Sequence, residues 1–357
     1  MGPSTLTGGQ RGILGAAFGL TVAAAVARVA GPHTVATFVI SAMALAALAA
    51  LVGEASEQLG ERYGPAATGL LQSTLGNLPE LFVGIFALRS GLVDVVRAAL
   101  IGSVLGNTLL VLGIAITVGG LRHGLQRFSA ESPRVIVTLL LVAVSALLVP
   151  TLASRLATPA ASHAVSLSNA SAVILVLLYA LSIPFWLQGG ARVTPETAES
   201  RPAALWSLQQ AIVLLALGSV GAGFVSSWFV GALEPATRSL GLSATFTGLV
   251  IVALASNAVE HAVGIRFAMK ARPDYAISTI LNSSLQVALL LTPVLVLVSR
   301  VVGPTHLTLV FPPLQVAAVA IATIVALAVV YDGEYVWLEG VALIGLYGVV
   351  VISFWWG

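Results

Sequence analysis

The chain is organised as long apolar runs separated by short polar stretches. Each run has about 20 residues, the length that an α-helix needs to cross the ~30 Å hydrocarbon core of a bilayer. Eleven runs are predicted as transmembrane helices: 13–30, 34–53, 66–88, 95–118, 133–152, 165–187, 205–229, 243–268, 275–299, 309–330 and 336–355. The first run also fits a signal peptide, because Arg11 precedes it and Ala25-Val26-Ala27 resembles a cleavage site. The pattern predicts an all-α membrane protein.

Composition supports a membrane protein. Only 8% of the 357 residues are charged and 58% are hydrophobic, whereas a soluble domain carries about 25% charged residues. The absence of cysteine excludes disulfides and thiolate metal sites. Lys and Arg are concentrated in the N-terminal tail and the even-numbered connectors, which predicts a cytoplasmic N-terminus. Short connectors and the lack of a long leader favour a prokaryotic plasma membrane.

An internal repeat appears when the chain is shifted by 180 residues. The pattern N-x-x-E-x-x-V-G-I, which runs from Asn77 to Ile85, recurs from Asn257 to Ile265. The copies lie on the third and eighth runs, five spans apart, so the second copy must enter the membrane in the opposite orientation. This predicts an inverted repeat with a substrate site near the midplane. The predicted parts are an N-terminal helix (1–32), a first five-helix repeat (33–188), a connecting loop (189–204) and a second five-helix repeat (205–357).

Glu80 and Glu260 are the acidic residues that lie well inside apolar runs. A charge at that depth costs at least ~2.5 kcal/mol, so two matched carboxylates need an explanation. A structural role, with both groups protonated or satisfied by polar neighbours, is one alternative. The functional alternative is that they share one divalent cation, which prefers oxygen ligands.

Electrostatics then predicts exchange between that cation and protons. Two carboxylates balance one divalent ion or two protons, and an empty site would leave two like charges in a low-dielectric environment. Loaded states are therefore favoured during the crossing. With two acids, the expected ratio is one divalent ion per two protons.

Further polar residues are predicted to complete the site or to orient its carboxylates. Gly76 and Pro79 are expected to loosen the first motif helix, and the second motif has no equivalent proline. Interhelical or same-helix hydrogen bonding is the alternative role for several hydroxyl and amide groups. The supporting residues are Asn77, Asn257, Gly76, Ser256, Ser73, Thr74, Ser103, Asn107, Ser283, Ser284 and Gln286. His261 follows Glu260 and is a candidate proton relay, with a structural role as the alternative.

The motifs resemble the cation/proton exchanger (CAX) family of the calcium/cation antiporter superfamily. The segments 53–64, 76–81 and 101–113 carry the resemblance in the first half, and Glu234-Pro235, 240–243 and 256–261 carry it in the second. The resemblance implies one N-terminal helix followed by five plus five inverted helices, with Glu80 and Glu260 as the calcium and proton site. It also implies that the second and seventh spans slide to alternate access. Glu54, Glu57 and Glu234 are then candidates for cation recruitment.

The predicted function is Ca²⁺/H⁺ antiport, and Mn²⁺ or another divalent cation remains open. The alternative is a Na⁺ or other monovalent cation/H⁺ antiporter, and an intramembrane enzyme or a channel is disfavoured. The only Glu-His pair lacks the H-E-x-x-H order of zinc proteases. We expect no cofactor and no nucleic-acid partner; the expected partners are the lipid bilayer and inorganic cations. The oligomeric state is not predicted.

Overall fold

The computed structural model describes residues 7–31, 35–63, 77–187 and 206–355, and it is helical almost throughout. Two short strands, β1 (Gln126–Arg127) and β2 (Glu334–Tyr335), pair antiparallel. The helices through the first half are α1 (Gly8–Ala30), α2 (Val35–Tyr63), α4 (Leu78–Arg89), α5 (Val93–Leu105), the π-helical turn η1 (Gly106–Val111), α6 (Leu112–His123), α7 (Glu131–Arg155), the 3₁₀ turn η2 (Pro159–His163) and α8 (Ala164–Leu187). The second half contains α9 (Leu208–Ser239), α10 (Ala244–Phe246), the π-helical η4 (Thr247–Val252), α11 (Ala253–Ser256), α12 (Ala258–Met269), α13 (Pro273–Gln286), the π-helical η5 (Val287–Leu291), α14 (Thr292–Val302), α15 (Pro313–Val330) and α16 (Trp337–Ser353).

Eight helices within the described residues are long and apolar enough to cross a membrane, or nine if a bent pair counts as one span. The helix Trp337–Ser353 is apolar but shorter. Many large apolar side chains point outward, including Phe18, Leu181 and Phe224, which are 62–75% exposed. Such a surface fits lipid rather than water. The all-α membrane class is therefore confirmed, whereas the count of eleven helices stays a prediction because much of the third run lies outside the described residues.

The helices form two compact units, and each unit draws segments from both halves of the chain. Unit 1 comprises Met1–Phe86, Leu181–Gly241 and Ala255–Val259. Unit 2 comprises Ala87–Ala180, Leu242–Leu254 and Glu260–Gly357. The division into an N-terminal helix and two sequential repeats was predicted from sequence similarity, and it stays a prediction.

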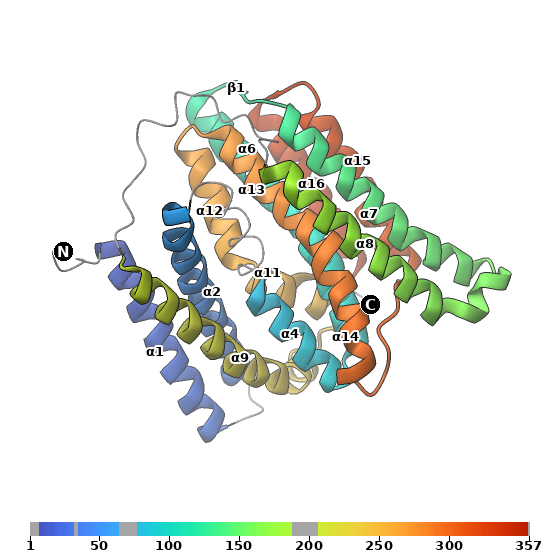
Figure 1. Ribbon diagram of the computed structural model, residues 1–357, viewed down its shortest axis with the longest axis horizontal. Coiled ribbons are helices and arrows are strands. Elements are labelled where there is room, and N and C mark those ends of the chain that lie inside the picture. The colour runs from blue at the N-terminus through green and yellow to red at the C-terminus, as the bar shows by residue number, and fades with distance from the viewer. Residues whose placement is uncertain (1–6, 32–34, 64–76, 188–205, 356–357) are drawn as a thin grey trace. The chain divides into compact units, whose positions relative to one another are not determined.

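In unit 1, α1, α2 and α9 pack side by side (Figure 1). The rings of Phe38 on α2 and Phe229 on α9 stack with their centroids 4.9 Å apart. A Cβ built on Gly218 of α9 would lie 3.0 Å from Val52, so the absence of a side chain lets α9 approach α2. The Thr37 hydroxyl of α2 donates to the Ala27 carbonyl of α1 at 3.1 Å, which fixes the end of α1 on its neighbour.

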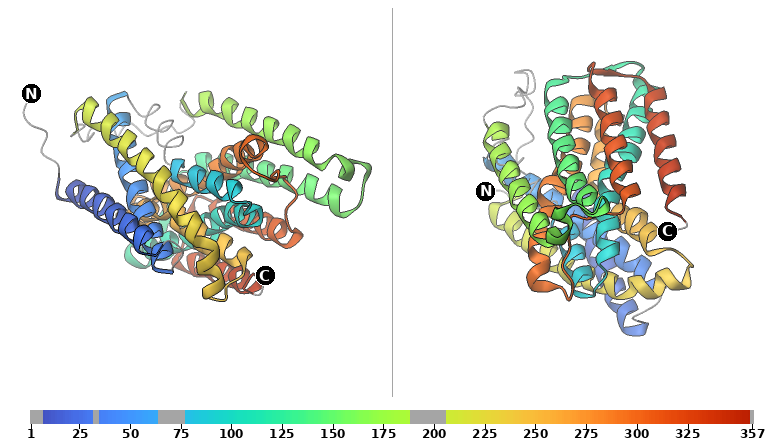
Figure 2. Two further views of the ribbon diagram at one scale, coloured as in Figure 1. Left: turned by 90° about the horizontal axis from the view of Figure 1, so that it is seen from below. Right: turned by 90° about the vertical axis from the view of Figure 1, so that its right-hand side faces the viewer.

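In unit 2, small residues allow α6 and α16 to pack closely (Figures 1 and 2). A Cβ built on Gly340 of α16 would lie 2.5 Å from the Gly113 carbonyl oxygen of α6. Likewise, a Cβ on Gly102 of α5 would lie 1.9 Å from the Leu249 carbonyl oxygen of η4. Glycine at these crossings is a steric requirement, as is common where membrane helices meet.

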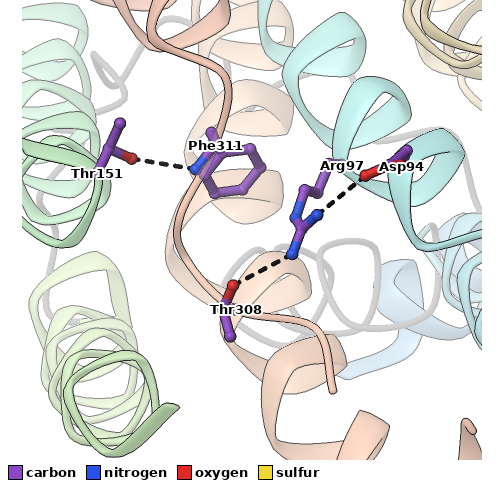
Figure 3. A network of polar contacts seen from close by, with 5 residues as sticks. All are labelled: Asp94, Arg97, Thr151, Thr308 and Phe311. Atoms are coloured by element: carbon purple, nitrogen blue, oxygen red, sulfur yellow. Dashed lines mark hydrogen bonds and ion pairs between the residues drawn. The ribbon is translucent and has the colours of Figure 1, made fainter. Parts of the chain in front are cut away.

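The connector between α14 and α15 is attached to several helices of unit 2 (Figure 3). The Phe311 amide donates to the Thr151 hydroxyl of α7 at 3.1 Å. Arg97 of α5 donates to the Thr308 hydroxyl at 3.1 Å and forms an ion pair with Asp94 at 2.9 Å. The connector therefore holds one end of unit 2 together.

Candidate functional site

Glu80 and Glu260 both lie in the first turn of a helix that follows an asparagine turn. Asn77 forms a turn directly before α4, and Asn257 forms a turn directly before α12. The Leu81 amide donates to the Asn77 carbonyl at 2.9 Å, as expected for a residue that starts a helix. A carboxylate in the first turn is stabilised by the positive end of the helix dipole. The sequence placed both acids well inside apolar runs, and the structure puts each of them at the start of a helix.

The break in the second motif does not depend on proline. The segments Ala244–Ser256 and Glu260–Met269 are bent by 63°, although this motif has no proline. Pro79 occupies the first turn of α4, where its missing amide proton costs no hydrogen bond. Gly76 lies outside the described residues, as do Ser73 and Thr74. In both motifs an asparagine forms the turn directly before the helix.

The corresponding helices of the two motifs have matching bounds. The helix α4 runs from Leu78 to Arg89 and α12 from Ala258 to Met269, so both bounds are 180 residues apart. The π-helical turns η1 and η5 also overlap at this offset. Such turns occur often at functional sites. The inverted orientation of the repeats stays a prediction.

In unit 1, the Glu80 carboxylate accepts a hydrogen bond from the second motif. Asn257 Nδ2 donates to Glu80 Oε1 at 3.2 Å and also lies 3.3 Å from the Ser256 hydroxyl. Glu80 is 7% exposed and Asn257 is 2% exposed. Asn77 is buried as well. Asn257, predicted as a supporting residue, thus contacts the glutamate of the other motif, 177 positions away in the sequence.

In unit 2, Glu260 belongs to a chain of hydrogen bonds that joins three elements. The Ser283 hydroxyl of α13 donates to Glu260 Oε2. Asn107 Nδ2, in η1, donates to the Ser283 hydroxyl at 3.0 Å. His261 Nε2 lies 2.9 Å from Asn107 Oδ1. His261 is therefore connected to the carboxylate beside it through two other side chains.

The remaining supporting residues are buried but occupy different places. Ser103 on α5 and Ser284 and Gln286 on α13 are at most 4% exposed. The sequence identified them as polar groups in apolar runs, and their burial agrees with that description. Their participation in a cation site stays a prediction.

The three acids suggested for cation recruitment have partners or fall outside the described side chains. Glu54 on α2 accepts from Gln10 of α1 at 2.7 Å and from Gln58 at 3.4 Å. Glu234 on α9 forms an exposed ion pair with Arg238. The Glu57 side chain lies outside the described part of the chain.

Gln10 is a residue that the sequence analysis missed. It forms a reciprocal capping box with Thr7 at the start of α1 and is 5% exposed. The spacing Thr-x-x-Gln before an apolar run is a recognised helix-start signal. This signal predicts that the first helix begins near residue 8, whereas the apolar run alone predicted residue 13.

Comparison with known proteins gives consistent matches over both motifs. A family model described as sodium/calcium exchanger protein matches residues 33–187 and 210–356, so α1 precedes the matched region. A Ca²⁺/H⁺ antiporter of Synechocystis sp. is 36% identical over 340 residues, which cover 89% of this chain and 90% of that protein. The Ca²⁺/H⁺ antiporter ChaA of Bacillus subtilis is 34% identical over 325 residues, which cover 89% and 91%. The structure of native YfkE has a TM-score of 0.80 and 32% identity, covering 97% of this chain and 99% of that one.

Proposed function

Because the chain belongs to the sodium/calcium exchanger protein family, we propose that it is a secondary antiporter that exchanges Ca²⁺ for protons. Relatives with 34–36% identity are named Ca²⁺/H⁺ antiporters. The observation that carries the proposal is the matched pair of carboxylates, each in the first turn of a helix that follows an asparagine turn, and in the second motif the span is bent by 63° at that point. Broken helices of this kind form ion sites in many transporters.

The hydrogen-bond donors described for the two carboxylates are neutral groups, which supports binding of an exchangeable cation or proton. Glu80 accepts from the neutral Asn257 amide, and Glu260 accepts from the neutral Ser283 hydroxyl. Glu260 forms no ion pair with any residue that the structure describes. Glu260 lies in an apolar span without a fixed cation among the described residues, so it needs a mobile one, either a metal ion or a proton.

Glu80 and Glu260 are proposed to share one Ca²⁺ or two protons. Calcium takes six to eight oxygen ligands, so the carboxylates require further oxygens from amide, hydroxyl or backbone groups. Ser283 and Asn107 are candidates either for a ligand or for orienting Glu260, because Ser283 contacts Glu260 and Asn107 contacts Ser283. With two carboxylates, the exchange is one calcium ion for two protons.

Alternating access is proposed to occur by movement of α2 and α9. Their close packing within unit 1, which includes the Phe38–Phe229 stack, supports their movement as a pair. A relay role for His261 remains a prediction, as does cation recruitment by Glu54, Glu57 and Glu234. Exchange of Na⁺ or another monovalent ion remains the alternative, since sodium also binds oxygen ligands.

The test is transport by the purified protein in liposomes with an acidic lumen, followed with ⁴⁵Ca²⁺. We expect gradient-driven uptake by the wild type and its loss in Glu80→Gln and Glu260→Gln. Glu131→Gln is the matched control, because Glu131 lies in the first turn of α7 but is exposed. Inhibition by excess Mn²⁺ but not by Na⁺ would support a divalent substrate. Uptake that persists in both glutamine variants would refute the shared site.

A further inference from the structure

The hydrogen-bond chain from His261 to Glu260 has one direction. An amide oxygen only accepts, so His261 Nε2 must donate to Asn107 Oδ1. An amide nitrogen only donates, so the Ser283 oxygen accepts from Asn107 Nδ2. The single hydroxyl proton of Ser283 is then left for Glu260 Oε2. Each donor fixes the orientation of the next group.

The opposite direction would be unfavourable for an ionised Glu260. If the Asn107 amide were turned over, its oxygen would face Ser283 and would take the hydroxyl proton. The carboxylate would then face serine lone pairs instead of a donor, and a buried charge without its hydrogen bond is costly. While His261 Nε2 carries a proton, its contact with Asn107 Oδ1 opposes that rotation, because the rotated amide would present a second donor to it.

We propose that Asn107 and His261 are positioning residues that hold the Ser283 hydroxyl in the donating orientation toward Glu260. This inference rests on the proposed function, because it concerns how Glu260 is presented to the exchanged cation. Ser283 holds Oε2, and Oε1 is left for the cation. In this role His261 acts through its Nε2 hydrogen and Asn107 acts through Ser283.

The burial of the chain supports a fixed arrangement. Asn107 is 1% exposed and Ser283 is 5% exposed, so water has little access to compete for their hydrogen bonds. Asn107 is the second residue of the π-helical turn η1, whereas His261 and Ser283 lie on α12 and α13. Three separate elements of unit 2 must therefore keep their places for the chain to form.

The first experiment is a double-variant cycle with ⁴⁵Ca²⁺ uptake in liposomes and Ca²⁺ binding to the purified protein. We expect Ser283→Ala to raise the KM and Kd for Ca²⁺ roughly tenfold, the effect of losing a hydrogen bond to a charged group. Asn107→Leu, which keeps the side-chain size, should raise them several-fold, yet add less than about twofold in the Ser283→Ala background. Thr108→Val is the matched control in the same turn, because the Thr108 hydroxyl donates to the Val104 carbonyl one helical turn earlier.

The second experiment tests whether His261 acts by its hydrogen bond to Asn107 or by gaining and losing a proton. Glutamine places an amide nitrogen near the position of histidine Nε2 and does not titrate near neutral pH. We expect His261→Gln to keep the KM for Ca²⁺ within about threefold of wild type, and His261→Leu to raise it about tenfold. Melting temperatures of all variants show whether each is folded.

The outcomes distinguish failure of the positioning role from failure of the proposed antiport function. Full additivity of Asn107→Leu and Ser283→Ala would overturn the positioning role, because Asn107 would then act independently of the serine. Equal losses in His261→Gln and His261→Leu would also overturn it and would favour the relay. If the folded wild type shows no proton-driven Ca²⁺ uptake, the proposed function itself fails.

Discussion

At the scale of single residues, two asparagines are associated with the two buried carboxylates in different ways. Asn257 donates directly to Glu80, whereas Asn107 reaches Glu260 through Ser283. Both amides are nearly inaccessible to solvent. A neutral donor stabilises a carboxylate but does not neutralise its negative charge. The carboxylate can therefore still bind a cation or a proton.

Removal of the Asn257 side chain tests the direct contact. We expect Asn257→Ala to lower the free energy of unfolding by about 1–3 kcal/mol, because the buried Glu80 carboxylate loses a donor. The measurement is thermal unfolding in detergent at neutral pH. In the Glu80→Gln background the same change should cost less, since the acceptor is no longer charged. Equal costs in both backgrounds would show that Asn257 acts on something other than Glu80.

The sequence was informative about which residues matter here and uninformative about how they pair. Glu80 and Glu260 could be identified because a carboxylate in an apolar run is costly and the repeat marks both positions. The partners could not be identified, because Asn257 and Glu80 are 177 positions apart and no local rule connects them. His261 was predicted as a proton relay from its place next to Glu260, and no local pattern indicates that its Nε2 contacts Asn107 on another element.

At the scale of elements, α6 and α16 pack closely at glycine positions, which have no side chain to separate the two backbones. Gly113 and Gly340 face each other across α6 and α16, where each position would place a Cβ within 2.8 Å of the other's carbonyl oxygen. Dispersion contacts, rather than hydrophobic burial, drive helix association within lipid. Close approach of these backbones is therefore a source of stability.

A single methyl group at this crossing should be destabilising. We expect Gly340→Ala to cost about 1–3 kcal/mol, because the new Cβ would overlap the Gly113 carbonyl and force the helices apart. Gly345→Ala is the control on the same helix, since nothing lies within 4 Å of its built Cβ. The measurement is the difference in melting temperature between these variants. A Gly340→Ala protein as stable as Gly345→Ala would contradict the packing argument.

Hydrophobic runs predicted the approximate positions of the helices because burial in lipid requires about 20 apolar residues per span. They could not predict the internal irregularities. The break at Asn257 and the π-helical turns η1 and η5 leave the apolar pattern unchanged. A π-helical turn alters the hydrogen-bond spacing by one residue, which hydropathy does not detect.

At the scale of the whole molecule, the family resemblance drawn from the motifs is confirmed over both halves of the chain. Both compact units combine segments from the first and second halves. The boundaries of the repeats stay a prediction, and each predicted repeat contributes helices to both units. Packing regroups helices that are distant in sequence, and a linear pattern does not encode this regrouping.

The predicted topology can be tested because the natural sequence contains no cysteine. Arg127 and Ala160 are exposed and lie beyond opposite ends of α7. With a cytoplasmic N-terminus, we expect a membrane-impermeant maleimide to label Ala160→Cys on intact cells. Arg127→Cys should react only after the membrane is opened. The reverse pattern would show that the N-terminus faces outward.

In the connector between α14 and α15, alternate backbone amides donate hydrogen bonds, as in a β-strand, but their acceptors are side-chain hydroxyls. The amides of Leu307, Leu309 and Phe311 donate to the hydroxyls of Ser299, Ser168 and Thr151, which belong to three different helices. The three donors are alternate residues, and their side chains are at most 2% exposed. Side-chain oxygens thus replace the carbonyl ladder that a neighbouring strand would supply. As a consequence, amide exchange with solvent should alternate along this segment, slow at the odd-numbered positions and faster between them.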